Sequence, residues 1–160
     1  RRHTRYISVT GVQTCALPIS VKPAPVTTVV AQPPATSGAG VLRDPNNILS
    51  KRSVFYDYDS EVIKDEYRPM LQAHAKYLAD NPNARMLIQG NTDERGGREY
   101  NLSLGQRRAE AVKRLLVIMG ARELQIESVS LGEEKPRCED KTEACYGQNR
   151  RSDMLHSGEF

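Results

Sequence analysis

Hydrophobic and polar residues follow two periods along this chain, and each period predicts a different kind of element. Residues 53–58 (SVFYDY) alternate with a period of two and are rich in aromatic residues, which indicates a β-strand. Over residues 66–80, apolar positions recur every three or four residues, which indicates a helix with Pro69 in its first turn. Residues 84–90 predict a second strand before the next polar stretch.

The second half of the chain continues this succession. Residues 101–119 show the clearest helical pattern, and their apolar face ends at Gly120, a favourable residue after a helix. Residues 126–131 and 150–156 predict two further strands. The resulting order, β-α-β-α-β-β, predicts an α/β fold in which helices cover a mixed sheet as a two-layer sandwich.

The chain before residue 44 shows neither period. Residues 1–20 are too polar for a secretory signal, and they resemble the translation of a common short-read sequencing adapter, so we expect them to be non-native. Residues 21–43 are rich in Pro, Ala and Thr and predict an extended linker. We expect the folded domain at residues 44–157, and we expect that the natural start of the protein has been replaced.

The charge balance changes once the adapter-like segment is set aside. The whole chain has a formal net charge of +3, from 23 Lys and Arg against 20 Asp and Glu. Arg1, Arg2 and Arg5 lie in residues 1–20, which leaves 23 − 3 = 20 basic residues against 20 acidic ones. A neutral domain gives no argument for nucleic acid as a partner. The sequence also contains no apolar run long enough to span a membrane as a helix.

The sequence offers little of the chemistry that an enzyme needs. His74 and His156 have no partner nearby in the sequence, and Cys138 and Cys145 lack the further Cys or His ligands of a zinc site. The two cysteines predict either a disulfide or two free thiols. The spacing of Gly96 and Gly97 fits no phosphate-binding loop, so they indicate a tight bend. We therefore predict no catalytic residue, metal or cofactor.

Mixed charges gather between the second predicted strand and the long helix. Asp93 follows the strand and Arg108 lies about two turns into the helix. A bend between them could bring both side chains to the opening of one pocket, with Thr92 and Asn101 beside them. A carboxylate can accept from an ammonium group and a guanidinium can hold a carboxylate, so the two side chains would suit a zwitterion. The alternative is that they pair with each other or bind the backbone.

Three segments of this region resemble a known family. The stretches LIQGNTDERGGREYNLSLGQRRAEAVKRLL, VSLGEEKP and NRRSDML occur in order and with suitable gaps. Over residues 50–155 the chain resembles the OmpA-like C-terminal domain family, in particular its peptidoglycan-associated lipoprotein branch. The resemblance implies non-covalent binding of the peptidoglycan stem peptide through diaminopimelate, whose side chain ends in an ammonium and a carboxylate group.

The resemblance also implies a set of binding residues. It assigns the two charged ends of diaminopimelate to Asp93 and Arg108. Around them it implies a pocket of polar and apolar residues, with Arg150 at its border: Tyr58, Asp59, Thr92, Arg95, Asn101, Leu104 and Arg150. Two positions depart from many members of the family, because Asn91 stands where His is common and Ser60 where Lys is common. Asn91 cannot titrate, so we expect little pH switching from this position.

The wider role is likewise implied by the resemblance. The lipoprotein branch is anchored in the outer membrane by an acylated N-terminal Cys, faces the periplasm, and works with TolB and the Tol system to keep the envelope intact and to constrict it at division. Residues 21–43 would then be the tether between anchor and wall. Two alternatives remain: the wall-binding domain of a porin or flagellar stator protein, and an enzyme acting on the wall.

Overall fold

A computed structural model describes residue 42 and residues 45–160 of the 160-residue chain. The predicted adapter-derived segment and nearly all of the predicted linker lie outside the described residues. The elements are, in chain order, η1 (Ile48–Ser50), β1 (Ser53–Phe55), η2 (Asp65–Tyr67), α2 (Arg68–Asp80), β2 (Met86–Asn91), α3 (Arg98–Ile118), η3 (Glu123–Gln125), β3 (Ile126–Gly132), α4 (Glu143–Asn149) and β4 (Arg151–His156).

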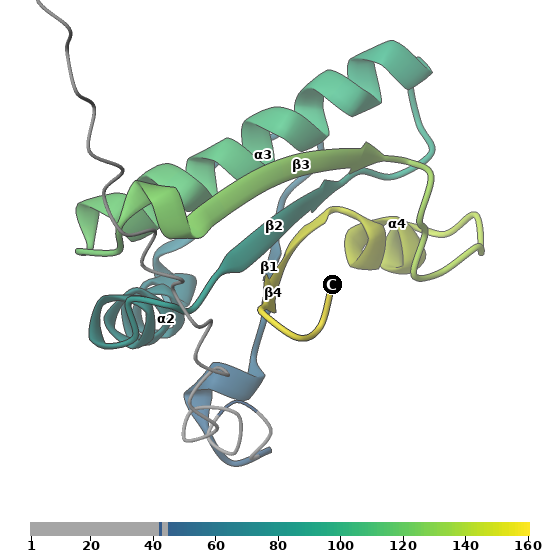
Figure 1. The fold of residues 1–160 in the computed structure, drawn as a ribbon. Coiled ribbons are helices and arrows are strands. Elements are labelled where there is room, and N and C mark those ends of the chain that lie inside the picture. The colour runs from purple at the N-terminus through teal and green to yellow at the C-terminus, as the bar shows by residue number, and fades with distance from the viewer. Residues whose placement is uncertain (1–41, 43–44) are drawn as a thin grey trace, which may run out of the picture. The chain divides into compact units, whose positions relative to one another are not determined.

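The strands form one mixed sheet in the order β1-β4-β2-β3. The C-terminal strand β4 lies inside the sheet and pairs antiparallel with both β1 and β2, whereas β3 lies at the edge and runs parallel to β2. Figure 1 shows α3 lying along the sheet, with α2 below its far end and α4 beside the start of β4. The carboxyl ends of β2 and β3 therefore open near α4, where loops can form a binding site.

The core forms where α2 and α3 meet the sheet. Both helices and all four strands contribute side chains to one buried cluster: Val54, Tyr56, Met70, Leu71, Ala75, Leu78, Met86, Ile88, Ala109, Val112, Leu116, Ala121, Ile126 and Met154. Two glycines allow the close contact between α3 and β2, and any side chain at these positions would prevent it. A Cβ atom at Gly90 of β2 would lie 1.9 Å from the carbonyl oxygen of Gly105 in α3. The absence of both side chains lets α3 rest directly on β2.

The sequence predicts the α/β class and every strand and long helix, and the structure confirms them. The predicted helix at 101–119 begins slightly earlier, at Arg98, and Gly120 after it adopts a left-handed conformation with φ 107°. The predicted order was incomplete, because α4 lies between β3 and β4. This helix has only seven residues in a polar segment, which is too short for an apolar period to be visible.

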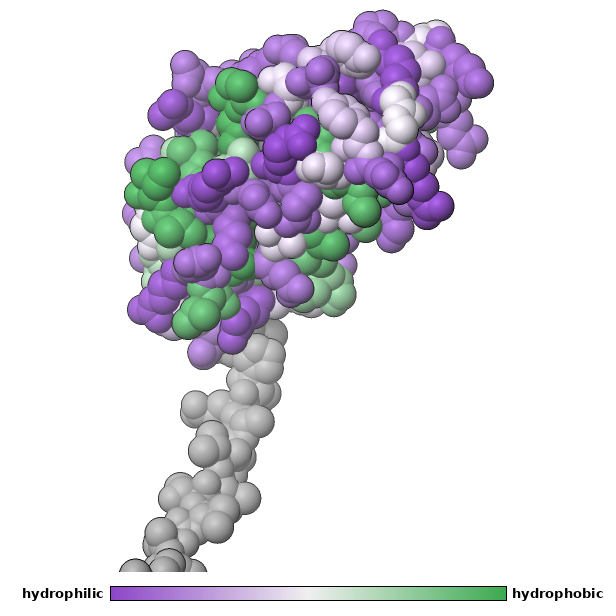
Figure 2. Space-filling view, turned by 90° about the horizontal axis from the view of Figure 1, so that it is seen from above, coloured by the Kyte–Doolittle hydropathy of each residue, from purple (hydrophilic) through white to green (hydrophobic). Residues whose placement is uncertain are grey.

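The face of the described part that is seen in Figure 2 is mostly polar. Figure 2 shows small apolar patches separated by hydrophilic side chains on the visible face. Within residue 42 and residues 45–160, no helix has the length and apolar character needed to cross a membrane. Leu42, at the end of the predicted linker, is buried, and its carbonyl oxygen accepts a hydrogen bond of 2.6 Å from Arg52.

Candidate functional site

Loops at the end of the sheet enclose a small pocket of about 120 Å³. Its walls come from the segment after β1, the bend between β2 and α3, the first three turns of α3 and the residue before β4. Asp59 and Gly96, with φ of 54° and 107°, turn two of these segments toward the pocket. The lining residues are Tyr58, Asp59, Asp93, Arg95, Gly96, Tyr100, Asn101, Leu104, Arg108 and Arg150.

Arg108 is the most deeply buried cation at this site. Its side chain is fully buried, and its guanidinium group donates hydrogen bonds to the backbone carbonyl oxygens of Ser60 (2.8 Å), Asn91 (3.0 Å) and Asp57 (3.3 Å). The group also lies 4.9 Å from the ring centre of Tyr56. It forms no ion pair with any residue that the structure describes. The alternative to ligand binding was that Asp93 and Arg108 pair with each other or bind the backbone. Arg108 does bind the backbone, but it does not pair with Asp93.

The burial of Arg108 changes its pKa. Burial disfavours the charged form and lowers the pKa of Arg108 to about 10, while Tyr56 and Asp93 act in the opposite direction. The side chain remains charged at neutral pH. A guanidinium group has five N–H donors. Three hydrogen bonds of Arg108 go to carbonyl oxygens, so N–H groups remain for a further acceptor.

Asp93 lines the same pocket and is also buried. Its Oδ2 atom accepts hydrogen bonds from Arg95 (2.7 and 3.2 Å) and from Arg150 (3.0 Å). Its Oδ1 atom accepts only a long bond of 3.3 Å from the backbone N–H of Arg95. One carboxylate oxygen is therefore fully used, and the other keeps capacity for a donor.

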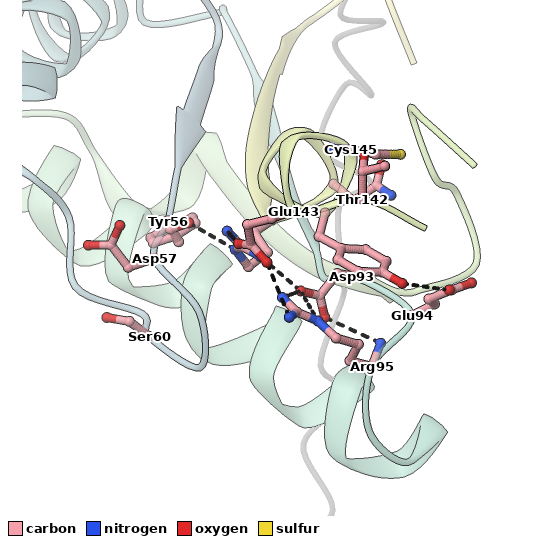
Figure 3. A network of polar contacts seen from close by, with 12 residues as sticks. Tyr56, Asp57, Ser60, Asp93, Glu94, Arg95, Thr142, Glu143 and Cys145 are labelled. Carbon is pink, nitrogen blue, oxygen red and sulfur yellow. Dashed lines mark hydrogen bonds and ion pairs between the residues drawn. The ribbon is translucent and has the colours of Figure 1, made fainter. Parts of the chain in front are cut away.

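Two tyrosines hold Arg95 at the mouth of the pocket. The guanidinium carbon lies 4.3 Å from the ring centre of Tyr58 and 4.4 Å from that of Tyr146, so the cation stacks between both rings. The hydroxyl of Tyr146 donates to Glu94, 3.1 Å away. The hydrogen bonds that Arg95 donates to Asp93 are the main cause that raises the pKa of Arg95. Figure 3 shows Arg95 beside Asp93, with Glu94 farther out.

The predicted site residues are brought together with one exception. All except Thr92 line the pocket. Asn101 donates to Glu133 (2.6 Å) and to the carbonyl oxygen of Arg95 (3.2 Å), and so fixes the bend above the start of α3. The structure does not bring Thr92 into the pocket, because Thr92 lines a neighbouring cavity instead. Successive residues of a strand point to opposite sides, and Thr92 and Asp93 follow β2 directly.

Three residues of this region were not predicted from the sequence. Tyr100 of α3 lines the pocket and donates a hydrogen bond to Asp59. Glu143 and Tyr146 of α4 contact Arg95, although neither lines the pocket itself. Because α4 was not predicted, nothing placed these side chains near Asp93. A disulfide between Cys138 and Cys145 joins α4 to the preceding loop. No group of three or more His, Cys, Asp or Glu side chains within the described ranges is arranged to hold a metal ion.

The OmpA family matches this chain over residues 55–150. A peptidoglycan-associated lipoprotein from Pseudomonas putida is 43% identical over 122 residues, which cover 75% of this chain and 73% of the relative. A peptidoglycan-associated lipoprotein from Haemophilus influenzae is 48% identical over 104 residues, which cover 65% and 68% of the two chains.

Solved structures have the same fold. The crystal structure of the peptidoglycan-associated lipoprotein from Burkholderia pseudomallei is 53% identical, with a TM-score of 0.71, over 72% of this chain and 98% of that chain. The C-terminal domain of Helicobacter pylori MotB has a TM-score of 0.60 at 20% identity, over 65% of this chain and 81% of that chain. The second similarity concerns the fold alone.

Proposed function

Because the chain belongs to the OmpA family and matches its peptidoglycan-associated lipoproteins over most of their length, we propose that it binds peptidoglycan non-covalently. The ligand is the stem peptide, and the group recognised is the side-chain end of diaminopimelate. No bond is made or broken in this binding, so the protein is not an enzyme.

The observation that carries the proposal is the buried guanidinium group of Arg108. A buried charge without a counter-ion is costly, and Arg108 has only carbonyl oxygens as described hydrogen-bond partners. It lines a pocket that a small ligand can enter. A ligand carboxylate would supply the missing counter-charge and accept the remaining N–H groups. Asp93, which lines the same pocket, would accept from the ligand's ammonium group through Oδ1.

This pairing favours a zwitterion over a ligand with a single charge. The side chain of diaminopimelate ends in an ammonium and a carboxylate group on the same carbon atom. Lysine, with an ammonium group alone, would leave Arg108 without a counter-ion. Tyr58 and Leu104 add apolar surface at the wall of the pocket for the methylene groups of the side chain.

The cellular role that we propose follows from the lipoprotein relatives and from the family resemblance. A lipid anchor at the natural N-terminus would hold the protein at the periplasmic face of the outer membrane. The domain would then tether that membrane to the cell wall, as part of the Tol system and with TolB as a partner. Such a tether would support envelope integrity and constriction of the outer membrane at division.

A pull-down with purified sacculi tests the binding function. Asp93→Asn removes one charge at nearly constant size, and Arg108→Gln removes one charge and shortens the side chain. Arg98→Gln is the matched control for the second variant, because Arg98 is exposed on α3 and pairs with Glu134. Loss of one charged partner costs roughly 2–5 kcal/mol, so binding should weaken by at least about thirtyfold in the first two variants. The control should bind like the wild type, and the supernatant should contain no released wall fragments.

Two results would contradict the proposal. The first is unchanged binding by both pocket variants when circular dichroism shows that they are folded. The second is equal loss of binding in Arg98→Gln, which would indicate a general charge effect in place of a specific pocket.

A further inference from the structure

Four charged side chains next to the pocket form a closed ring, which we call the charge ring: Asp93, Arg95, Glu143 and Arg150. Asp93 pairs with Arg95 (2.7 Å) and with Arg150 (3.0 Å). Glu143 pairs with the same two arginines, at 3.2 Å and 2.7 Å. Each carboxylate thus contacts both cations, and each cation contacts both carboxylates. Figure 3 shows Glu143 reaching over Asp93 and Arg95 from α4.

The charge of this ring decides whether Asp93 can attract another cation. Two arginines and two carboxylates sum to zero. Without Glu143, Asp93 would be left with two guanidinium groups, and the remaining charge of +1 would repel an incoming ammonium group. The side chain of Arg150 is only 8% exposed and that of Asp93 only 6%, so solvent screens this part of the ring weakly.

We infer that Glu143 is a positioning residue that keeps Asp93 available for the ammonium group of the ligand. It does so by neutralising Arg95 and Arg150 and by holding both on Oδ2, so that Oδ1 remains open. Glu143 does not line the pocket and acts through Asp93. This inference rests on the proposed function, since it concerns how the same pocket recognises its ligand.

The structure of α4 explains how Glu143 is held in place. Thr142 caps the helix by accepting from the backbone N–H of Cys145, and Cys145 is bonded to Cys138. Asn149, at the end of α4, accepts from the backbone N–H of Cys138 (3.1 Å) and donates to its carbonyl oxygen (2.7 Å). The short helix is thus attached to the preceding loop at both ends.

The test compares two ligands in a Glu143→Gln variant. One is a stem peptide with diaminopimelate. The other contains 2-aminopimelate, which keeps the side-chain carboxylate and lacks the ammonium group. The ratio of the two dissociation constants, measured by titration calorimetry, reports the contribution of the ammonium group alone. Glu134→Gln is the matched control, because Glu134 pairs with the exposed Arg98 outside the pocket.

Glu143→Gln should lower the preference for diaminopimelate by about fivefold, as expected for one charge on an exposed side chain. Glu134→Gln should leave the preference unchanged. If Glu143 only stabilised the local structure, both peptides would weaken equally and the ratio would stay constant, which would overturn the inference. If the wild type itself bound both peptides equally or neither peptide, the proposed function would fail first.

Discussion

A buried histidine pair at the far end of the sheet predicts a loss of stability in mild acid. His74 of α2 and His156 of β4 are 0% and 1% exposed, and their ring nitrogens Nδ1 and Nε2 lie 3.0 Å apart. The other nitrogen of His74 lies 2.9 Å from the carbonyl oxygen of Lys51 and must donate to it. His156 therefore donates to His74 when both rings are neutral. Its own Nδ1 atom has no partner among the described residues.

The magnitude follows from the pKa of His156. Burial, with a smaller contribution from the charge of His74, lowers this pKa from 6.5 to about 4. The folded state therefore binds the proton less tightly than the unfolded state. The stabilising contribution is complete above about pH 6.5 and is lost as the pH falls toward about 4. Between about pH 7 and pH 5, this single group should reduce the free energy of unfolding by about 2 kcal/mol.

Urea unfolding at these two pH values, followed by circular dichroism because the chain has no Trp, measures the effect. His156→Gln keeps a donor for His74 and cannot titrate in this range. We expect the wild type to lose about 2 kcal/mol more than the variant between the two conditions. Both proteins carry the same carboxylates, so the contribution of these groups cancels in the comparison. An equal loss in both proteins would refute the assignment of the effect to His156.

Two further predictions concern the scaffold of the site. Gly90→Ala should destabilise the domain by about 3 kcal/mol or more, because the new Cβ atom would lie 1.9 Å from the carbonyl oxygen of Gly105. A Cβ atom at Gly97 would meet no atom within 4 Å, so Gly97→Ala should leave the melting temperature nearly unchanged. Equal melting temperatures for both variants would contradict the close approach of α3 and β2. Replacing Cys138 and Cys145 together by Ser should lower the free energy of unfolding by about 2 kcal/mol, because the disulfide closes a short loop between cysteines that are seven positions apart in the sequence. Identical urea midpoints with and without the disulfide would contradict this estimate.

The fold was predictable because its elements have clear periods. The apolar face of α3 and the alternation in β1 indicate their elements without tertiary information. The sequence did not reveal that the C-terminal strand β4 lies between β1 and β2, because pairing between distant strands leaves no local signal. The short α4 was also missed, since its helical character depends on Thr142, on the disulfide and on packing against the loop.

The two main charged residues of the site were predictable from the sequence, but their hydrogen-bond and ion-pair partners were not. Asp93 and Arg108 stand out in the sequence as opposite charges on either side of a bend, and the structure places both at one pocket. That Arg108 binds three backbone carbonyls instead of Asp93 depends on the course of residues 57–60 and 91, which no sequence pattern reveals. Glu143 joins the site only because α4 folds over the β2–α3 bend.

The affinity of the two pocket variants for edited ligands shows whether Arg108 holds the carboxylate group and Asp93 the ammonium group. Titration calorimetry would compare stem peptides with diaminopimelate, with lysine (no side-chain carboxylate) and with 2-aminopimelate (no ammonium). We predict that the wild type prefers diaminopimelate to both analogues. Arg108→Gln should lose its preference over the lysine peptide, and Asp93→Asn its preference over the 2-aminopimelate peptide. If each variant kept the wild-type preferences, or if the losses were exchanged between the variants, the account would be contradicted.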